Sequence, residues 1–423
     1  MTNTSILNAR VINPESDSDG VTDIHISGQN IVATGTAPAD YTAEQTINAA
    51  GMVACPGLID VYARLREPGY EKKTDIQTET RAALLNGITT LICSPDTDPV
   101  IDEVATVELI HRRVQDARYA RVHPLAAMTR QLDGSRLSEL ATLTNAGCVG
   151  ASHADVPLSD TLVIRRVMEY AKTFDIVLMF NPVDQWLAAG GCAHEGRVAT
   201  RLGLPGIPVA AETVALSMLL ELARTTGVRI HLSRITSARG AELIRDAKSR
   251  GMPVTADTSI NHLFVTEQAL ADFDSVYHSV APFRSLEDLQ KLREAAIDGT
   301  FDALCSDHAP HEADAKLAPF PATEAGLSTL DTYLPQLLEF GKQEQLSLAA
   351  TLKLATSGPA SIFGLDAGTL NVGATADIVL LDLEAKRVID KQNLLSRGKN
   401  SPRLNEELAG VIRHVFMEGQ QKL

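Results

Sequence analysis

Eight short apolar runs, separated mostly by stretches with helical periodicity, constrain the fold of this chain more than any other feature. The runs are "GLIDVYA", "ITTLICS", "VHPLAAM", "GCVGAS", "IVLMFN", "RIHLSR", "PVTAD" and "FDALCSD". The segments with helical periodicity are 78–85, 104–115, 161–173, 212–225, 238–248 and 286–296. Strands that alternate with helices predict an α/β fold with a parallel sheet, and eight of them are typical of a (β/α)₈ TIM barrel. An open, doubly wound sheet shares the alternation, but the strand count favours the barrel.

The two ends of the chain have a different texture from the middle. "SILNARVI", "TDIHISG" and "NIVATG" near the start alternate apolar and polar positions, and "ADIVLLDL" and "GVIRHVFMEG" do so near the end. Such alternation is typical of strands with one buried face. We therefore expect residues 1–53 and 365–423 to form one small, β-sandwich-like domain from both termini, and residues 54–364 to form the barrel.

The charge balance narrows the classes of partner. The 423 residues carry a formal net charge of -15, which disfavours nucleic acid and anionic membranes. No run approaches the roughly 18 apolar residues of a membrane span, and no secretory signal is evident at the start. The five cysteines are scattered, which favours reduced thiols over a disulfide framework. These features predict a cytoplasmic protein.

The segment "CSDHAPH" directly follows the eighth apolar run. Because active sites of TIM barrels lie at the carboxyl ends of the strands, its Asp307, His308 and His311 are candidate site residues. They could bind a metal or act as a general base. The same letters also fit a turn in which Asp307 caps a helix and the histidines face solvent. Arg66 in "LREPG" could receive a substrate carboxylate or form a surface salt bridge with a nearby glutamate.

Several segments in a fixed order resemble the dihydroorotases of the amidohydrolase superfamily. They are "PGLIDVYARLREPGYEKKTD", "SPDTDP", "INHLFVTE", "SDHAPH" and "GTLNVGATADIVLLD". The resemblance implies a (β/α)₈ barrel with a small β-domain built from both ends. It also implies a zinc site made by an H-x-H after the first strand, histidines after strands five and six, a bridging acidic residue and an aspartate after strand eight.

Most of these ligand positions hold residues that do not bind zinc. The H-x-H positions hold Tyr62 and Arg64, the strand-five position holds Asn181, and the strand-six position holds Arg234. The acidic position falls on His153 or Ala154 in "SHAD", with Asp155 close by, and Asp96 replaces a substrate-binding asparagine. Asp307 remains, as do Arg66 and His311, which match the family's carboxylate binders.

Two arginines in the ligand cage argue against a metal. A fixed positive charge ~4 Å from a divalent cation costs about 8 kcal/mol at an effective dielectric constant near 20. Arginine cannot escape this cost by losing its proton. We therefore predict that zinc is absent and that the chain has no cofactor. Because Asp307 would then be a buried charge without a cation, we also predict that Arg64 or Arg234 pairs with it. The alternative is that both arginines extend into solvent.

Two further histidines have simpler interpretations. His231, inside an apolar run, is expected to be a core histidine with its hydrogen bonds satisfied. Cys192, His194 and Glu195 in "GCAHEG" could bind a metal, although one short loop rarely completes a zinc tetrahedron.

The resemblance implies a function without catalysis. Some bacteria carry an inactive dihydroorotase-like chain that their aspartate transcarbamoylase needs for assembly, and the losses at the ligand positions fit such a chain. We therefore predict a pseudoenzyme of pyrimidine biosynthesis in a hetero-oligomer with the aspartate transcarbamoylase catalytic chain. The alternative is an active amidohydrolase with a rearranged site around Asp307, His308, His311 and His153.

Overall fold

The structure is a computed structural model that describes residues 3–423, and its larger part is a closed parallel barrel. All eight predicted runs form its strands, which are β6 (Leu58–Ala63), β7 (Ile88–Cys93), β8 (Arg121–Ala127), β9 (Gly150–Ser152), β10 (Leu178–Phe180), β13 (Ile230–Leu232), β14 (Val254–Ser259) and β15 (Ala303–Cys305). Neighbouring strands pair in this order from β6 to β15. A bridge between Ala63 and His308, with the Arg64 amide donating to the His308 carbonyl at 2.8 Å, joins the first strand to the last. The predicted TIM barrel is confirmed.

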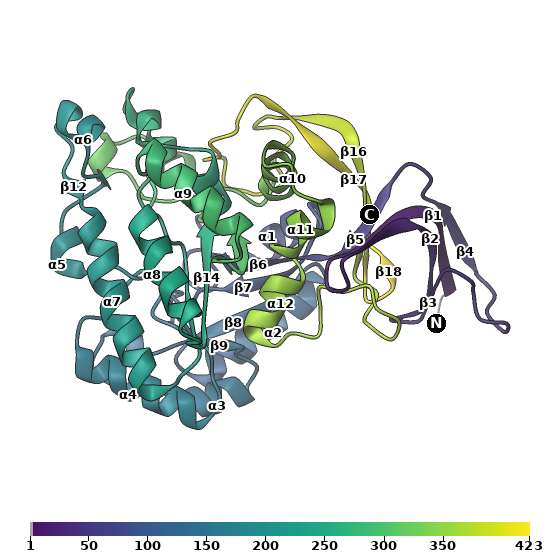
Figure 1. Cartoon of the computed structure of the whole chain (residues 1–423), viewed down its shortest axis with the longest axis horizontal. Coiled ribbons are helices and arrows are strands. Elements are labelled where there is room, and N and C mark those ends of the chain that lie inside the picture. The colour runs from purple at the N-terminus through teal and green to yellow at the C-terminus, as the bar shows by residue number, and fades with distance from the viewer. Residues whose placement is uncertain (1–2) are drawn as a thin grey trace.

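Helices surround the barrel (Figure 1). They are α1 (Ile76–Leu85), α2 (Val104–Ala117), α3 (Leu140–Asn145), α4 (Thr161–Thr173), α5 (Gln185–Ala188), α6 (Arg197–Leu202), α7 (Val209–Thr226), α8 (Ala238–Ser249), α9 (Leu286–Ile297), α10 (Tyr333–Gln343), α11 (Leu348–Lys353) and α12 (Ser357–Phe363). The local sequence explains α4 well. The Asp160 side chain caps its first turn, and Ile164, Val167, Met168 and Ala171 bury one face at helical spacing.

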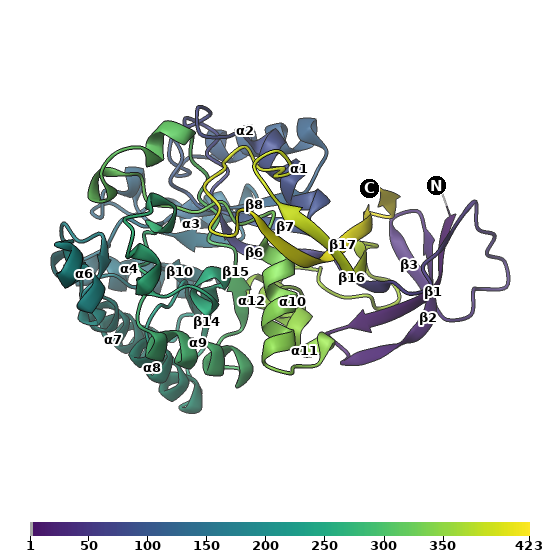
Figure 2. The ribbon, with the colours of Figure 1, turned by 90° about the horizontal axis from the view of Figure 1, so that it is seen from above.

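The second sheet is built from both ends of the chain. Its strands are β1 (Asn3–Asn13), β2 (Ser18–Ser27), β3 (Asn30–Thr34), β4 (Gln45–Asn48), β5 (Val53–Pro56), β16 (Ile378–Ile389), β17 (Glu406–Met417) and β18 (Gln420–Gln421). β5 lies between β1 and β16, where Pro56 pairs with Ile378, so this strand connects the two halves of the sheet. Figures 1 and 2 show the composite sheet at one end of the molecule, beside both termini.

A C-terminal arm, residues 390–405, returns from the composite sheet to the barrel. Asn400 fixes it to the loop after β15. Its Nδ2 donates to the carbonyls of Ala309 at 3.2 Å and Gly326 at 2.9 Å, and its Oδ1 accepts from the His311 amide at 3.1 Å. The arm therefore supports one of the loops that carry candidate site residues.

A small insertion follows α5 and packs around its own apolar cluster. Two short parallel strands, β11 (Ala193–His194) and β12 (Gly206–Ile207), flank α6. None of the helices in residues 3–423 has the length and apolar character that crossing a membrane requires.

Candidate functional site

The carboxyl ends of the barrel strands bring together the positions at which the resemblance implies zinc ligands. Tyr62 is in β6 and Arg64 directly follows it. Asn181 follows β10 and Arg234 comes two residues after β13. Asp307 comes two residues after β15. The barrel fold therefore places five residues that are distant in sequence at one mouth.

Asp155, in the loop after β9, is the centre of this cluster. Its Oδ2 accepts a hydrogen bond from Arg64 Nη2, and its Oδ1 accepts from Arg234 Nη2. Asn181 Nδ2 also donates to Oδ1, at 3.0 Å. One carboxylate thus bridges two guanidinium groups and the amide from the strand-five position.

The two arginines each bind a second carboxylate. Arg64 Nε donates to Asp96 Oδ2 at 2.8 Å, and Arg234 Nη1 donates to Asp307 Oδ1 at 3.0 Å. The predicted pair between Arg234 and Asp307 is therefore present. The alternative, that both arginines extend into solvent, is wrong, because the Arg234 side chain is fully buried and that of Arg64 is 7% exposed.

The ring of Tyr62 packs against both arginines. The Cζ atom of Arg234 lies 3.9 Å from the centre of the Tyr62 ring, and that of Arg64 lies 5.3 Å from it, so both cations face its π system. The phenol hydroxyl contacts Ser94 Oγ at 3.1 Å. Burial raises the pKa of Tyr62, which keeps the hydroxyl protonated.

A hydrogen-bonded turn presents Arg234 to the mouth. Its backbone has a φ of 57°, in the left-handed region, and its amide donates to Asp257 Oδ1 at 2.7 Å. His231 contacts the other oxygen of Asp257 at 2.8 Å and Thr255 Oγ1 at 2.9 Å. His231 is fully buried, so the predicted core histidine with satisfied hydrogen bonds is confirmed. This core pair fixes the turn that carries Arg234.

The protonation equilibria of the three carboxyls differ. Burial alone would raise the pKa of Asp155, but Arg234 and Arg64 hold it well below its ordinary value. Burial would likewise raise the pKa of Asp96, and Arg64 holds it below the ordinary range. At Asp307, burial outweighs the attraction of Arg234 and the pKa is raised. Asp155 is therefore the group most firmly held as an anion.

The donor set at this mouth does not fit a zinc ion. Zinc needs neutral imidazole, thiolate or carboxylate ligands in an open cage. Here the guanidinium groups of Arg64 and Arg234 occupy the cage and hydrogen-bond its carboxylates. Across residues 3–423, no three His, Cys, Asp or Glu side chains are grouped so that they could hold a metal ion.

The candidate motif after β15 is split by the fold. His308 Nε2 lies 2.8 Å from Glu79 Oε2, and its Nδ1 accepts from the Thr329 amide at 3.1 Å. His308 is fully buried. Its ring contacts Glu79 and Thr329, whereas Asp307 binds Arg234. His311 is also buried. The interpretation that these histidines face solvent is therefore wrong, because the loop folds back onto α1 and the C-terminal arm.

Arg66 and His311 remain together at the edge of the mouth. Arg66 Nη2 lies 3.2 Å from His311 Nε2, and Arg66 Nε donates to the Pro310 carbonyl at 3.3 Å. Lys73 Nζ lies 3.3 Å from His311 Nδ1. Burial, reinforced by Arg66 and Lys73, lowers the pKa of His311 to about 2, so its ring is neutral. The alternative of a surface salt bridge from Arg66 to a nearby glutamate is wrong.

The remaining candidate residues make hydrogen bonds or apolar contacts outside the arginine cluster. His153 contacts Thr129 Oγ1 at 2.9 Å and the Val156 carbonyl at 2.7 Å, away from the arginine cluster. His194 Nδ1 lies 3.2 Å from Arg284 Nη1. Cys192 packs in the apolar cluster of the insertion, so the "GCAHEG" loop holds no metal-binding group of three.

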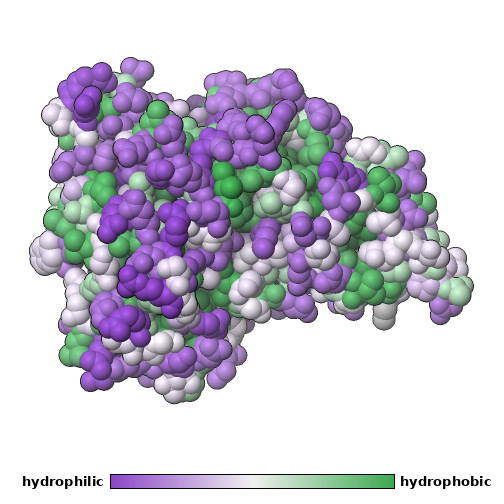
Figure 3. Space-filling view, viewed as in Figure 1, coloured by the Kyte–Doolittle hydropathy of each residue, from purple (hydrophilic) through white to green (hydrophobic). Residues whose placement is uncertain are grey.

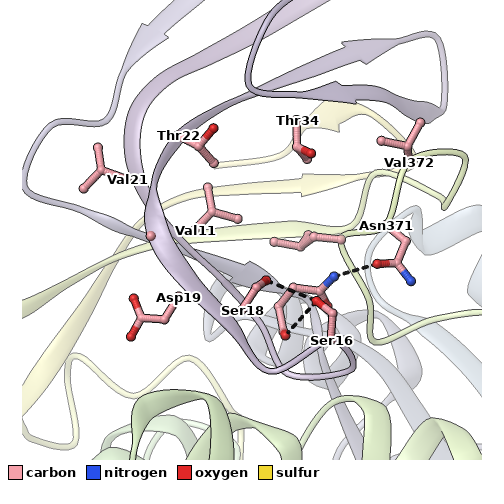
Figure 4. Close-up of a pocket in the computed structure, with 12 residues that line it drawn as sticks. Val11, Ser16, Ser18, Asp19, Val21, Thr22, Thr34, Asn371 and Val372 are labelled. Carbon is pink, nitrogen blue, oxygen red and sulfur yellow. Dashed lines mark hydrogen bonds between the residues drawn. The ribbon is translucent and has the colours of Figure 1, made fainter.

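Open space is small beside the cluster and larger elsewhere. Two cavities that border Asn181 have volumes of about 20 Å³ each, room for one water molecule. A groove of about 440 Å³ lies in the composite sheet, lined by residues such as Val21, Thr34 and Asn371 (Figure 4). Another, of about 820 Å³, lies between α10, α11 and the β16–β17 hairpin. Neither groove is lined by a residue of the arginine cluster.

A closed (β/α)₈ barrel with a sheet from both termini and a polar cluster at its mouth defines an amidohydrolase-type protein. Residues 192–422 match the amidohydrolase family, and residues 51–240 match a family described as dihydro-orotase-like. Dihydroorotase-like proteins of Pseudomonas putida and Pseudomonas aeruginosa are each 45% identical to this chain over 415 residues. Each alignment covers 98% of this chain and 98% of the relative. The chain belongs to the dihydroorotase-like family.

Other relatives extend the comparison. A dihydroorotase of Syntrophotalea carbinolica is 38% identical, covering 98% of this chain and 97% of that protein. An L-hydantoinase (dihydropyrimidinase) from Arthrobacter aurescens has a TM-score of 0.88 at 24% identity, covering 100% of this chain and 96% of its own. The hydantoinase likeness shows the shared fold.

Proposed function

We propose that this chain is a non-catalytic dihydroorotase-like protein that acts as a structural subunit of an aspartate transcarbamoylase complex in pyrimidine biosynthesis. The observation that carries the proposal is the pair of buried arginines bridged by Asp155. Arg64 and Arg234 supply, as fixed cations, the positive charge that zinc supplies in an active site. The barrel keeps its shape because its carboxylates are still neutralised.

The chemistry of the family supports the absence of catalysis. Hydrolysis of dihydroorotate needs an activated hydroxide that attacks the ring amide and a Lewis acid on the amide carbonyl. In the reverse direction, cyclisation of carbamoyl aspartate, the same groups activate the carboxylate and take up the hydroxide that leaves. A guanidinium group can donate hydrogen bonds, but it neither binds nor ionises a water as a metal does. Asp307, occupied by Arg234, is not free to act as a general base. We therefore expect no dihydroorotase turnover and no bound zinc.

The partner follows from the resemblance to inactive dihydroorotase-like chains. We infer a cytoplasmic hetero-oligomer with the aspartate transcarbamoylase catalytic chain. The alternative, an active amidohydrolase with a rearranged site, gains some support because relatives such as the Syntrophotalea carbinolica protein are named dihydroorotases. It requires His308, His311 and His153 to act with Asp307, and each of these histidines hydrogen-bonds elsewhere.

The first test combines metal analysis with a turnover assay. We expect the purified chain, produced with added zinc, to contain no stoichiometric zinc and to leave dihydroorotate unchanged. The matched variant is Tyr62→His/Arg64→His/Asn181→His/Arg234→His, which we expect to take up zinc. Zinc together with turnover in the unmodified chain would overturn the proposal. A quadruple variant that folds but binds no zinc would contradict the assignment of these positions as lost ligand sites.

The second test is co-expression with the aspartate transcarbamoylase catalytic chain of the same organism. We expect the two chains to co-elute as one large complex and the transcarbamoylase to lose activity when this chain is omitted. Separate elution with a fully active transcarbamoylase would sink the assembly role. Replacing the vestigial Arg66 with Met should leave co-elution unchanged, because the proposal assigns it no part in assembly.

A further inference from the structure

One edge of β2 has no partner along the first half of the strand. β3 pairs with β2 only from Ile24 to Ser27. Beyond that point the Gly35 amide donates to the Asp23 carbonyl at 2.8 Å, and Gly35, with a φ of 88°, turns the chain away from β2. Residues 18–22 therefore pair with β1 on one side and with no strand of residues 3–423 on the other.

The ladder between β1 and β2 shows which backbone groups point toward this free edge. The Arg10 amide donates to the Met52 carbonyl at 3.0 Å, away from β2, so Arg10 and Val21 face each other as a pair without hydrogen bonds. Such pairs alternate along an antiparallel ladder, so the N–H and C=O groups of Val21 and Asp19 point outward. The Asp23 carbonyl points the same way and accepts the last hydrogen bond from the β3 side.

The groove of about 440 Å³ in the composite sheet occupies the place where a longer β3 would lie. One wall is the first half of β2, and the other is the segment 370–372. The chain after this segment pairs with the far edge of β3, where the Ile31 amide donates to the Ala374 carbonyl at 2.9 Å. Since β3 separates the two walls as far as Thr34, its end leaves a space as wide as one strand between them.

The bottom of the groove is apolar and unfilled. Val11 and Leu370 line it, and Figure 4 shows Val11 with Asn371 across the groove from β2. Gly20 has no side chain, and a Cβ atom at this position would meet no other atom within 4 Å. In Figure 3 the visible face of the composite sheet, at the right of the view, is largely pale and green. The groove can therefore receive an apolar side chain in the space over Gly20.

The charges beside the groove are mainly negative. Residues 11–63 contain no lysine or arginine. Four acidic residues lie in the β1–β2 turn and the first half of β2: Glu15, Asp17, Asp19 and Asp23. Asp19 pairs with Arg10 at 2.6 Å, whereas Glu15 and Asp23 accept hydrogen bonds from uncharged amide groups. Acidic residues on a strand edge discourage pairing between two identical edges and attract a cationic strand.

We propose that the edge of β2 at residues 18–22 binds an extended segment of a partner protein in which basic and apolar residues alternate. The segment adds a strand in line with β3, and its backbone bonds to the outward groups of Asp19 and Val21. Its residues opposite these two share their outer face, where lysine or arginine meets the carboxylates. The residue between them points into the space over Gly20 and is apolar. The proposal involves neither the arginine cluster nor the barrel, so it stands or falls separately from the proposed function.

The experiment uses the full chain and a fluorescein-labelled peptide, KVKVKV, blocked at both ends. We expect saturable binding by fluorescence anisotropy and slower hydrogen exchange at the Asp19 and Val21 amides when the peptide is bound. The same peptide with N-methylated lysine amides keeps its charge but loses hydrogen bonds to β2, so it should bind about tenfold more weakly or worse. Val21→Pro removes an outward N–H without affecting the β1 ladder and should weaken binding by a similar factor. Val21→Thr keeps this N–H and is the matched control, with unchanged binding.

Three results would overturn the proposal. One is the absence of saturable binding. Another is equal binding of the methylated peptide, which would reduce the effect to general attraction between a cationic peptide and an anionic protein. The third is exchange at Asp19 and Val21 that slows when the protein alone is concentrated, which would assign the edge to a second copy. If Val21→Pro does not fold, Gly20→Val replaces it, because its side chain fills the empty space over β2 and should weaken binding in the same way.

Discussion

At the scale of single residues, the barrel mouth shows how cations fixed in the chain can replace a metal. Asp155 accepts hydrogen bonds from both arginines, and Asp96 and Asp307 each accept from one. Paired in this way, buried Asp307 and the partly buried Asp96 and Asp155 have the cost of removing their charges from water offset by the arginines. The arginines are therefore part of the folded core.

Asp155→Asn should destabilise the chain by about 3–5 kcal/mol, because it leaves two buried guanidinium groups without their shared carboxylate. The pKa of Asp155 is lowered in the folded state. Its stabilisation is therefore present above the unfolded pKa of about 4 and is lost as the pH falls through the folded value. Urea denaturation at pH 7 and at pH 3 measures both effects, and the difference between wild type and variant should shrink at the lower pH.

The matched control for this prediction is Glu169→Gln on α4. Its carboxylate pairs with Arg165 and Arg166 at the surface, where exposed pairs contribute about 0–1 kcal/mol. An Asp155→Asn variant no less stable than this control would show that the buried pairs do not stabilise the fold.

Sequence reasoning identified the arginine and asparagine positions of this cluster but not its centre. The ligand positions were readable because motif order fixes them along the chain. Asp155 was placed only near the acidic position, since a shift of one residue after a strand changes which side chain enters the mouth. Ala154 has a φ of 52°, and this left-handed turn directs His153 to Thr129 and Asp155 to the arginines. The letters "SHAD" carry no clear signal for such a turn.

At the scale of elements, the regular alternation made the barrel predictable. Each of the eight apolar runs became a strand because a parallel strand covered by helices is buried on both faces. Segment 161–173 matched α4 to the residue, since Asp160 provides a clear start. No helix was predicted at α3, α5, α6, α10, α11 or α12. α10 contains Pro335 and Gly341, two residues that weaken a helical pattern.

The strands near the C-terminus also differ from expectation. The run "ADIVLLDL" predicts a short strand, but β16 continues beyond it to Ile389. Its pairing with β17 shifts register between Asp382 and Lys386, which is an irregularity that interrupts the alternation.

The C-terminal arm gives an element-scale prediction. Asn400→Ala removes the partners of two buried carbonyls and of the His311 amide. Each unsatisfied buried group costs about 1–3 kcal/mol, so we expect a loss of about 3 kcal/mol or more and faster hydrogen exchange at the His311 amide. Asn393→Ala is the control, because Asn393 bonds only to Asp390 in an exposed turn. Equal exchange in the two variants would contradict the fastening role of the arm.

At the scale of the whole molecule, several buried neutral histidines predict sensitivity to acid. Burial lowers the pKa values of His123, His262 and His278 to about 4, and that of His311 to about 2. In the unfolded chain these groups bind protons near pH 6.5. Stability present above that pH is therefore lost as the pH falls, because the unfolded state takes up more protons.

Two carboxyls oppose this trend. Burial raises the pKa of Asp60 to about 6 and also raises that of Asp307. The pKa values of His153 and His194 are lowered as well, so six histidines stand against two carboxyls. Stability should therefore fall below about pH 6.5, by about 1.4 kcal/mol per pH unit for each proton that the unfolded chain binds in excess. Urea midpoints measured at intervals from pH 7 to 4 test this, and His123→Gln should reduce the slope by about one proton. A stability that is constant or rises over this range would contradict the prediction.

The composite sheet has a consequence for how the chain is made. Pro56 in β5 pairs with Ile378 in β16, which a ribosome adding ~5–20 residues per second reaches some tens of seconds later. During that interval β5 can pair with β1, but the edge that later pairs with β16 has no partner. This edge is then available to strands of other nascent chains. Newly made molecules therefore pass through a period in which the barrel can already be forming while the sheet beside it is unfinished, and the last segment to leave the ribosome completes it.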